Sequence, residues 1–363
     1  MITKFLCFSY IIGKKEALMK KKLWTITKLL IVIIILFMAG CLIMIQFTCV
    51  PVTKLTRMGF SGGKEGVQYT HHPEYEQRIQ TIEEKLDVSY ASAYDLHTYD
   101  IYYPKEKGSY PLLLWVHGGA FVGGDKADTR TYMEMVASYG YTVISMNYAL
   151  APEQKYPTPV YQMMELLEDI QTKDYPIDFQ NIFIGGDSAG AHIAGEFTTL
   201  QINPQYQEFT GIKACLKPQQ IKGFLSFCGL LDIKAYDDTD SWLSNFLFDQ
   251  SAWAYFDDKH WETSSNMKQA DFMPWITSSF PPTLLTDGNT NSFMKQAEAM
   301  DKCLKDLHVS SKLLTYDNDL PHEYQFQLER TQAIETFQEA KSAALYSYMP
   351  TIVKLYRFPS LPA

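Results

Sequence analysis

A small hydroxyl stands between two glycines at the corner of a predicted strand-to-helix turn. The segment G-D-S-A-G spans Gly186 to Gly190; the apolar run Ile182–Ile184 precedes it, and a helical stretch from Ala191 to Leu200 follows. A serine hydroxyl is a weak nucleophile and must project from the backbone into reach of a base. A sharp turn allows this only when the neighbouring residues are small. The pattern therefore predicts that Ser188 is a catalytic nucleophile.

Two glycines directly follow an earlier apolar segment. The β-rich run Leu112–Val116 leads into H-G-G-A-F, His117 to Phe121. Glycines after a strand let main-chain N–H groups approach a ligand closely, here the oxygen that becomes negative when a carbonyl carbon is attacked. We expect Gly118, Gly119 and Ala189 to donate the N–H groups of this oxyanion hole.

The motifs occur in an order that is known from one enzyme family. H-G-G-A-F is followed by N-Y-A-L-A-P-E-Q-K-Y-P at Asn147 to Pro157 and then by G-D-S-A-G. Over about residues 95–345 the chain resembles the hormone-sensitive-lipase-like esterases and acetyl esterases, a branch of the α/β-hydrolases. The resemblance implies an α/β fold with a mostly parallel eight-stranded sheet and a lid. It also implies hydrolysis of carboxylic esters without a metal or another cofactor.

The base and its orienting partner are expected after two later strands. The resemblance requires a histidine after the last strand, and His322 follows the β-rich run Lys312–Tyr316. It also places an aspartate shortly after the preceding strand, where this chain has Asp287 at the strand end and Asn291 at the aligned position. Either residue remains a candidate for the third catalytic member, and an amide in that role costs about 10⁴ in rate. Two carboxylates nearer to the histidine are weaker candidates: Asp317 and Asp319.

The elements that must position these residues alternate along the chain. Helical stretches separate seven short β-rich runs: Tyr99–Tyr103, Leu112–Val116, Thr142–Met146, Ile182–Ile184, Phe224–Phe227, Thr283–Thr286 and Lys312–Tyr316. Such alternation predicts a mostly parallel sheet with helices on both faces. The interval of about residues 231–280 is crowded with aromatic residues, and we expect it to form a lid insertion at the carboxyl edge of the sheet.

The N-terminal segment has the composition of a membrane anchor. Leu29 to Val50 carries no charge and is long enough to cross a bilayer as a helix, and lysines cluster before it. The positive-inside rule then predicts a cytoplasmic basic segment and anchor over 1–50, a stalk or N-terminal arm over 51–95, and an extracytoplasmic hydrolase domain over 96–363. A cleaved signal or a lipoprotein site near Cys41 is the alternative. We favour a retained anchor because the apolar run continues past Cys41.

Charge and cysteine usage exclude several kinds of site. Residues 1–50 contain seven lysines and one glutamate and so carry +6. The whole chain has a net charge of −9, so the remainder carries −15. An acidic domain argues against nucleic acid as a partner. Three cysteines beyond the anchor lack metal-ligand spacing and are expected to be core thiols: Cys215, Cys228 and Cys303. The expected partners are a small-molecule ester and the membrane, and the oligomeric state stays open.

Three functions are compatible with these motifs. The first is a membrane-anchored serine hydrolase that cleaves carboxylic esters, of the short-acyl esterase or deacetylase-like kind. An amidase, an arylformamidase-like enzyme or a peptidase would use the same groups. A degenerate hydrolase that serves as a surface binding module is the third, because the position of the acid is irregular.

Overall fold

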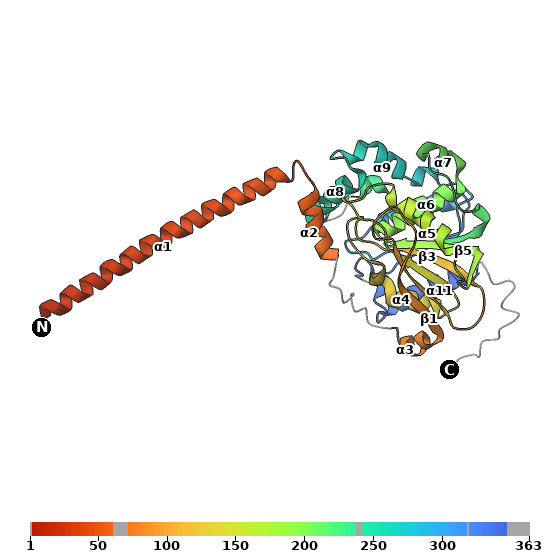
Figure 1. Ribbon diagram of the computed structural model, residues 1–363, viewed down its shortest axis with the longest axis horizontal. Coiled ribbons are helices and arrows are strands. Elements are labelled where there is room, and N and C mark those ends of the chain that lie inside the picture. The colour runs from red at the N-terminus through yellow and green to blue at the C-terminus, as the bar shows by residue number, and fades with distance from the viewer. Residues whose placement is uncertain (1, 61–71, 237–240, 318, 347–363) are drawn as a thin grey trace. The chain divides into compact units, whose positions relative to one another are not determined.

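The computed structural model describes residues 2–60, 72–236, 241–317 and 319–346. The chain divides into two compact units, Met1–Pro51 and Val52–Ala363 (Figure 1). The first unit is one helix, α1 (Ile2–Met44). Within it Met19–Met44, which contains an 18-residue window of mean hydropathy 2.8, is long and apolar enough to cross a membrane. The membrane-spanning helix was expected to continue to Val50, but α1 ends at Met44, and Val50 begins a new helix with Pro51 in its first turn.

The second unit is built on an eight-stranded sheet. Its strand order is β1-β2-β4-β3-β5-β6-β7-β8. Only the pairs β1–β2 and β2–β4 are antiparallel; the other five pairs are parallel. The strands are β1 (Ile82–Ser89), β2 (Thr98–Pro104), β3 (Tyr110–Val116), β4 (Thr142–Met146), β5 (Ile177–Asp187), β6 (Ile221–Phe227), β7 (Thr283–Thr286) and β8 (Ser311–Leu314). The predicted mostly parallel, eight-stranded α/β sheet is confirmed.

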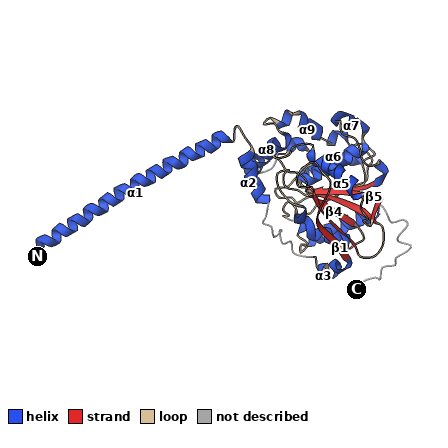
Figure 2. Cartoon of the chain, viewed as in Figure 1, coloured by secondary structure: helices blue, strands red, loops and turns tan. Residues whose placement is uncertain are grey.

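Helices lie on both sides of this sheet (Figure 2). They are α2 (Val50–Phe60), α3 (Tyr75–Arg78), α4 (Arg130–Ala137), α5 (Thr158–Ile170), α6 (Ala189–Ile202), α7 (Pro204–Thr210), α8 (Trp242–Phe256), α9 (Ser265–Ala270), α10 (Met294–Asp306) and α11 (Thr331–Tyr346). In α5, the buried residues Val160, Met163, Leu167 and Ile170 recur every three or four positions. This period places one apolar stripe on the core side of the helix.

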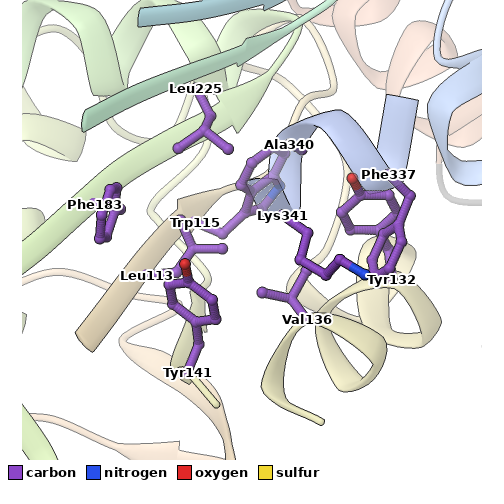
Figure 3. A pocket seen from close by; sticks show the side chains of 10 residues that line it. All are labelled: Leu113, Trp115, Tyr132, Val136, Tyr141, Phe183, Leu225, Phe337, Ala340 and Lys341. Atoms are coloured by element: carbon purple, nitrogen blue, oxygen red, sulfur yellow. The ribbon is translucent and has the colours of Figure 1, made fainter. Parts of the chain in front are cut away.

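One layer of the core lies between the central strands and two helices. Trp115 of β3, Phe183 of β5, Tyr132 of α4 and Phe337 of α11 border a narrow apolar pocket (Figure 3). Aromatic rings meet edge to face there, with 5.1 Å between the ring centroids of Tyr132 and Phe337. The packing of this layer holds the central strands in place, and their carboxyl ends carry the candidate site.

The boundary predicted at residue 96 is too late. Residues 82–89 were assigned to a stalk or N-terminal arm, yet they form β1 and pair with β2. Most side chains of β1 are exposed because it is an edge strand, so its apolar pattern is weak. Residues 61–71 of that arm, and 347–363 of the predicted hydrolase domain, lie outside the described residues.

Two smaller expectations have mixed outcomes. The interval predicted as a lid contains α8 and α9 between β6 and β7, and its action as a lid stays a prediction. Of the thiols expected in the core, Cys228 is buried, but Cys303 is only half-buried and Cys215 is exposed.

Candidate active site

Ser188 occupies the tight turn between β5 and α6. Its φ of 50° lies in the left-handed region, which a residue with a side chain adopts only under local constraint. A Cβ atom on Gly190 would lie 2.1 Å from the carbonyl oxygen of Val116, and one on Gly186 would lie 2.6 Å from the backbone of Gly190. Any larger residue at either glycine would therefore push this turn apart. The half-buried Ser188 is presented at the carboxyl edge of the sheet.

The main chain of Ser188 is bound to the end of the neighbouring strand. Its N–H donates to the carbonyl of Phe227 at 2.9 Å, and its own carbonyl accepts from the N–H of Leu230 at 3.1 Å. Phe227 is the last residue of β6. Hydrogen bonds to β6 and to Leu230 thus hold the turn in addition to the close packing at its own glycines. A strained backbone persists only with such support.

The loop that was expected to hold the oxyanion, His117 to Gly124 and called the oxyanion loop below, differs from the expectation at one residue. The N–H of Gly118 donates to Oδ2 of Asp187 at 2.7 Å, so it is not free for an oxyanion. The prediction of Gly118 as a donor is wrong for this reason. Gly118 instead allows close packing, because a Cβ there would lie 3.1 Å from the Cβ of Ser188.

Three other N–H groups are available at this point. Among the described residues none accepts a hydrogen bond from the N–H of Gly119, Ala120 or Ala189. Gly119 and Ala189 were predicted as donors, and Ala120 was missed because only the glycines of this loop were considered. The carbonyl of Gly119 accepts from Val122 (3.0 Å) and Gly123 (2.9 Å), which closes the loop into a tight turn.

Asp187 connects the oxyanion loop to the turn that carries Ser188. Its carboxylate is buried and accepts from the indole Nε1 of Trp115 at 2.8 Å as well as from Gly118. Burial, and then the charge of Glu323, raise the pKa of Asp187 well above its usual range. Both carboxylate oxygens are used in these hydrogen bonds, which fix the spacing between the two motifs.

His322 lies against Asp287 and not against Asn291. The Nδ1 atom of His322 is 3.4 Å from Oδ1 of Asp287, an ion-pair contact slightly longer than a hydrogen bond. The fully buried Asp287 also accepts from the N–H groups of Gly288 (2.6 Å) and Phe293 (2.7 Å). Asn291 is exposed and has a φ of 49°. Of the two candidates for the third member, the fold therefore brings Asp287 to the histidine; the weaker candidates are both exposed, Asp317 and Asp319.

Opposing effects set the proton affinity of His322. Burial disfavours the charged imidazolium, but the carboxylate of Asp287, with smaller contributions from Glu323 and Asp187, outweighs it and raises the pKa of His322 to about 9. The ring of Phe293 packs edge to face on the imidazole, with 5.5 Å between centroids. The imidazolium is thus strongly stabilised in this environment.

A cysteine that the sequence predicted only as a core thiol, Cys228, joins the histidine turn to the sheet. The N–H of Glu323 donates to Sγ of Cys228 at 2.9 Å, and the N–H of Cys228 donates to the carbonyl of Thr286 at 2.7 Å. Cys228 directly follows Phe227, whose carbonyl binds Ser188. Ser188 and Asp287 thus follow β5 and β7 at the carboxyl edge of the sheet, and His322 contacts Asp287 there. This is the edge at which open α/β sheets bind ligands.

The residues that could bind a metal lie in the same site. Among the described residues one group has ligand atoms within 4.8 Å of one another: Cys228, Asp287 and His322. Two of its members form the histidine–aspartate contact, so a soft divalent metal would have to displace that contact.

The site borders a pocket of about 190 Å³. Gly118, Gly119, Asp187 and Glu323 line it together with residues of α2, Gly59 and Phe60. The pocket therefore has an acidic wall beside the oxyanion loop and an aromatic wall supplied by the N-terminal helix α2.

Comparison with known proteins gives the same architecture. A family model described as alpha/beta hydrolase fold matches residues 113–326. The chain is 27% identical over 212 residues to an alpha/beta hydrolase of Acanthamoeba polyphaga mimivirus (56% of this chain, 58% of that protein). It is 36% identical over 87 residues to an esterase of Gibberella moniliformis (23% of this chain, 27% of that protein). The chain thus spans less than two thirds of either relative.

Solved structures share the fold at low sequence identity. Esterase B from Lactobacillus rhamnosis superposes with a TM-score of 0.64 at 21% identity, covering 77% of this chain and 92% of its own. A bacterial heroin esterase superposes with a TM-score of 0.59 at 19% identity, covering 74% and 85%.

Proposed function

We propose that this chain, which belongs to the α/β-hydrolase family, hydrolyses carboxylic esters through a covalent acyl-enzyme on Ser188. The observation that carries the proposal is the convergence of three features at one sheet edge. These are the strained serine turn, the His322–Asp287 contact and the unpaired N–H groups of the oxyanion loop. The esterase named among the relatives supports this reaction class.

The proposed reaction proceeds in two halves. Oγ of Ser188 attacks the ester carbonyl while Nε2 of His322 takes its proton, and Asp287 holds the Nδ1–H of the imidazolium that forms. His322 then gives the proton to the leaving alcohol. A water molecule attacks the acyl-enzyme by the same route, which releases the acid and restores Ser188.

The developing oxyanion is stabilised by main-chain N–H groups. Gly119 and Ala189 are the proposed donors, and Ala120 replaces Gly118 as the third. Loss of one such donor typically costs about 3 kcal/mol of transition-state stabilisation. Because these donors are held by a packed backbone, they require little reorganisation when the charge develops.

The N-terminal helix is proposed to anchor the enzyme in a membrane. Met19–Met44 is long and apolar enough to span a bilayer, and the lysines that surround its beginning favour a cytoplasmic start with the catalytic unit on the other side. Membrane fractionation and protease protection of a C-terminally tagged chain test this. An unprotected catalytic unit on the cytoplasmic side, or a mature chain that starts at Cys41 or beyond it, would contradict it.

Short acyl groups are the proposed substrates. Phe60 walls the pocket beside the oxyanion loop, and one structure of the Lactobacillus esterase B is described with a tributyrin phosphonate inhibitor. Turnover of p-nitrophenyl esters from acetyl to palmitoyl by the full-length chain tests the proposal, with Ser188→Ala as the control. Faster turnover of anilides than of esters would instead indicate an amidase, and an inactive wild type would indicate a binding module.

A further inference from the structure

An arginine of the N-terminal helix α2 binds the back of the oxyanion loop. Nε of Arg57 donates to the carbonyl of Val122 at 2.5 Å, and Nη2 donates to the carbonyl of Ala151 at 2.6 Å. The same guanidinium forms a two-point contact with the carboxylate of Glu153, at 3.1 and 2.5 Å. One planar cation thus joins two segments that are far apart in the sequence. This geometry requires the fixed fork of arginine.

The loop that Arg57 binds cannot keep its shape by local preference. Ala120 and Phe121 are two successive non-glycine residues in the left-handed region, with φ of 53° and 63°. Such a backbone persists only when surrounding contacts determine it. Besides its own turn, the loop is held by the hydrogen bond from the N–H of Ala151 to the carbonyl of Phe121 at 2.9 Å. Because Arg57 binds the carbonyl of the same alanine, it supports this contact too.

Helix α2 also approaches the loop closely. A Cβ atom on Gly123 would lie 3.0 Å from the Cβ of Phe60 and 3.3 Å from the Cα of Arg57. Phe60 lines the pocket that Gly118 and Gly119 border. The helix therefore touches the loop from behind with Arg57 and faces the pocket with its last residue.

From these contacts we propose that Arg57 is a positioning residue for the oxyanion loop. Its guanidinium holds the carbonyls of Val122 and Ala151 so that the N–H groups of Gly119 and Ala120 keep the orientation that the oxyanion requires. The short segment between the predicted membrane span and the sheet is thereby a part of the active site and not a passive stalk. The inference rests on the proposed function, because it presumes an oxyanion intermediate.

The kinetic consequence is specific to the transition state. The N–H groups are needed only when the carbonyl oxygen becomes negative, so Arg57→Ala lowers kcat and leaves KM nearly unchanged. Deletion of a donor costs about 10²–10³ in rate, and a misplaced donor costs less, so we expect a fall of about 10- to 100-fold. Binding of a boronic acid, which forms a tetrahedral adduct with the serine, weakens by the same factor.

The experiment uses the full-length chain with matched variants. Arg78→Ala is the control, since Arg78 also lies on an N-terminal helix and pairs with a glutamate, Glu74, at 2.9 Å. Arg57→Lys keeps the charge but cannot bridge two carbonyls, so its activity falls between those of wild type and Arg57→Ala. Rates are normalised to the fraction of enzyme that a fluorophosphonate titrates. Guanidinium ion, at a concentration below the denaturing range, should restore part of the kcat of Arg57→Ala and leave Arg78→Ala unaffected.

The outcomes separate this inference from the proposed function. A fall in kcat and boronate affinity with unchanged KM and partial rescue supports the role of Arg57. Equal kcat and boronate affinity in the Arg57→Ala and Arg78→Ala enzymes overturns it. If Arg57→Ala does not fold, an Arg57→Lys enzyme with wild-type kcat and boronate affinity overturns it equally. A wild type that neither turns over esters nor reacts with the fluorophosphonate refutes the proposed function itself.

Discussion

Replacement of Asp287 by asparagine separates the two candidates for the third catalytic member. The carboxylate is fully buried, contacts His322 at 3.4 Å and accepts two main-chain N–H groups. Asparagine has almost the same shape, but it removes the negative charge and keeps only one of the two acceptor oxygens that Gly288 and Phe293 use. The substitution therefore tests the electrostatic role of Asp287 with little change in packing.

The size of the effect follows from the proton affinity of His322. A rise of the pKa of His322 from 6.5 to about 9 corresponds to roughly 3 kcal/mol of net stabilisation of the imidazolium, at about 1.4 kcal/mol for each tenfold step in affinity. Asp287 is the largest favourable contribution to that rise. Its loss therefore costs about 10² in rate, and the wrong imidazole tautomer extends the loss toward about 10⁴.

The pH profile shows, independently of the rate, in which direction Asp287 shifts the pKa of His322. The base must be neutral to accept a proton, so kcat/KM of the wild type rises with pH until about 9. In Asp287→Asn, burial becomes the dominant influence on the imidazole, so the pKa of His322 falls and the rising limb moves to lower pH.

Initial rates on a p-nitrophenyl ester between pH 5 and 10, corrected for spontaneous hydrolysis, measure both quantities. Asn291→Asp is the matched control, and it should leave the rate and the profile within about threefold of wild type, since Asn291 is exposed. The reasoning is refuted if Asp287→Asn keeps more than a tenth of the activity with an unmoved pH profile. A large gain in rate from Asn291→Asp would instead assign the role to residue 291.

Three further predictions concern the support of the site. Gly190→Ala should destabilise the fold by about 3 kcal/mol or more, because its Cβ would lie 2.1 Å from a carbonyl oxygen. Gly140→Ala has free space but a φ of 93°, so it should cost about 1 kcal/mol. Denaturant titration measures both costs, and equal costs would contradict the steric argument. Burial raises the pKa of Glu196 to about 8. Between the usual carboxyl pKa and 8 the folded chain therefore binds more protons than the unfolded chain, and the free energy of unfolding falls as pH rises through that window. Glu196→Gln should raise Tm at pH 8 and change it little at pH 4.5, and a larger gain at pH 4.5 would contradict this direction. Ser188→Gly should abolish ester turnover. Because glycine tolerates the φ of 50°, the variant should also have a free energy of unfolding about 1 kcal/mol higher. A variant less stable than the wild type would show that the turn is not strained.

Local patterns predicted the sheet well and its edge poorly. The runs Thr142–Met146 and Thr283–Thr286 coincide with β4 and β7, because buried parallel strands read as continuous apolar segments. The edge strand β1 escaped recognition because its sequence, I-E-E-K-L-D-V-S, shows mainly charged and exposed residues. Helix α2 was not predicted because its residues directly follow the long hydrophobic run, and their polar and apolar pattern gives no helix signal separate from that run.

The candidate site was predictable in its residue types but not in its pairings. Ser188 was singled out by its two glycines, whose steric role the structure bears out. Gly118 was misassigned because the partner of its N–H, Asp187, is brought beside it only when β3 and β5 pair. The choice between Asp287 and Asn291 depended on which side chain the loop after β7 turns toward the histidine, and spacing along the chain carries no such information.

The attachment site of an active-site-directed phosphonate tests the central claim most directly. The full-length chain is treated with a fluorophosphonate, digested and mapped by mass spectrometry. We predict one adduct, on Ser188, that is absent in Ser188→Ala and forms far more slowly in His322→Ala, because the imidazole activates the hydroxyl. An adduct on another residue, or labelling of the wild type that is unchanged in either variant, would contradict the proposed assignment of Ser188 and His322.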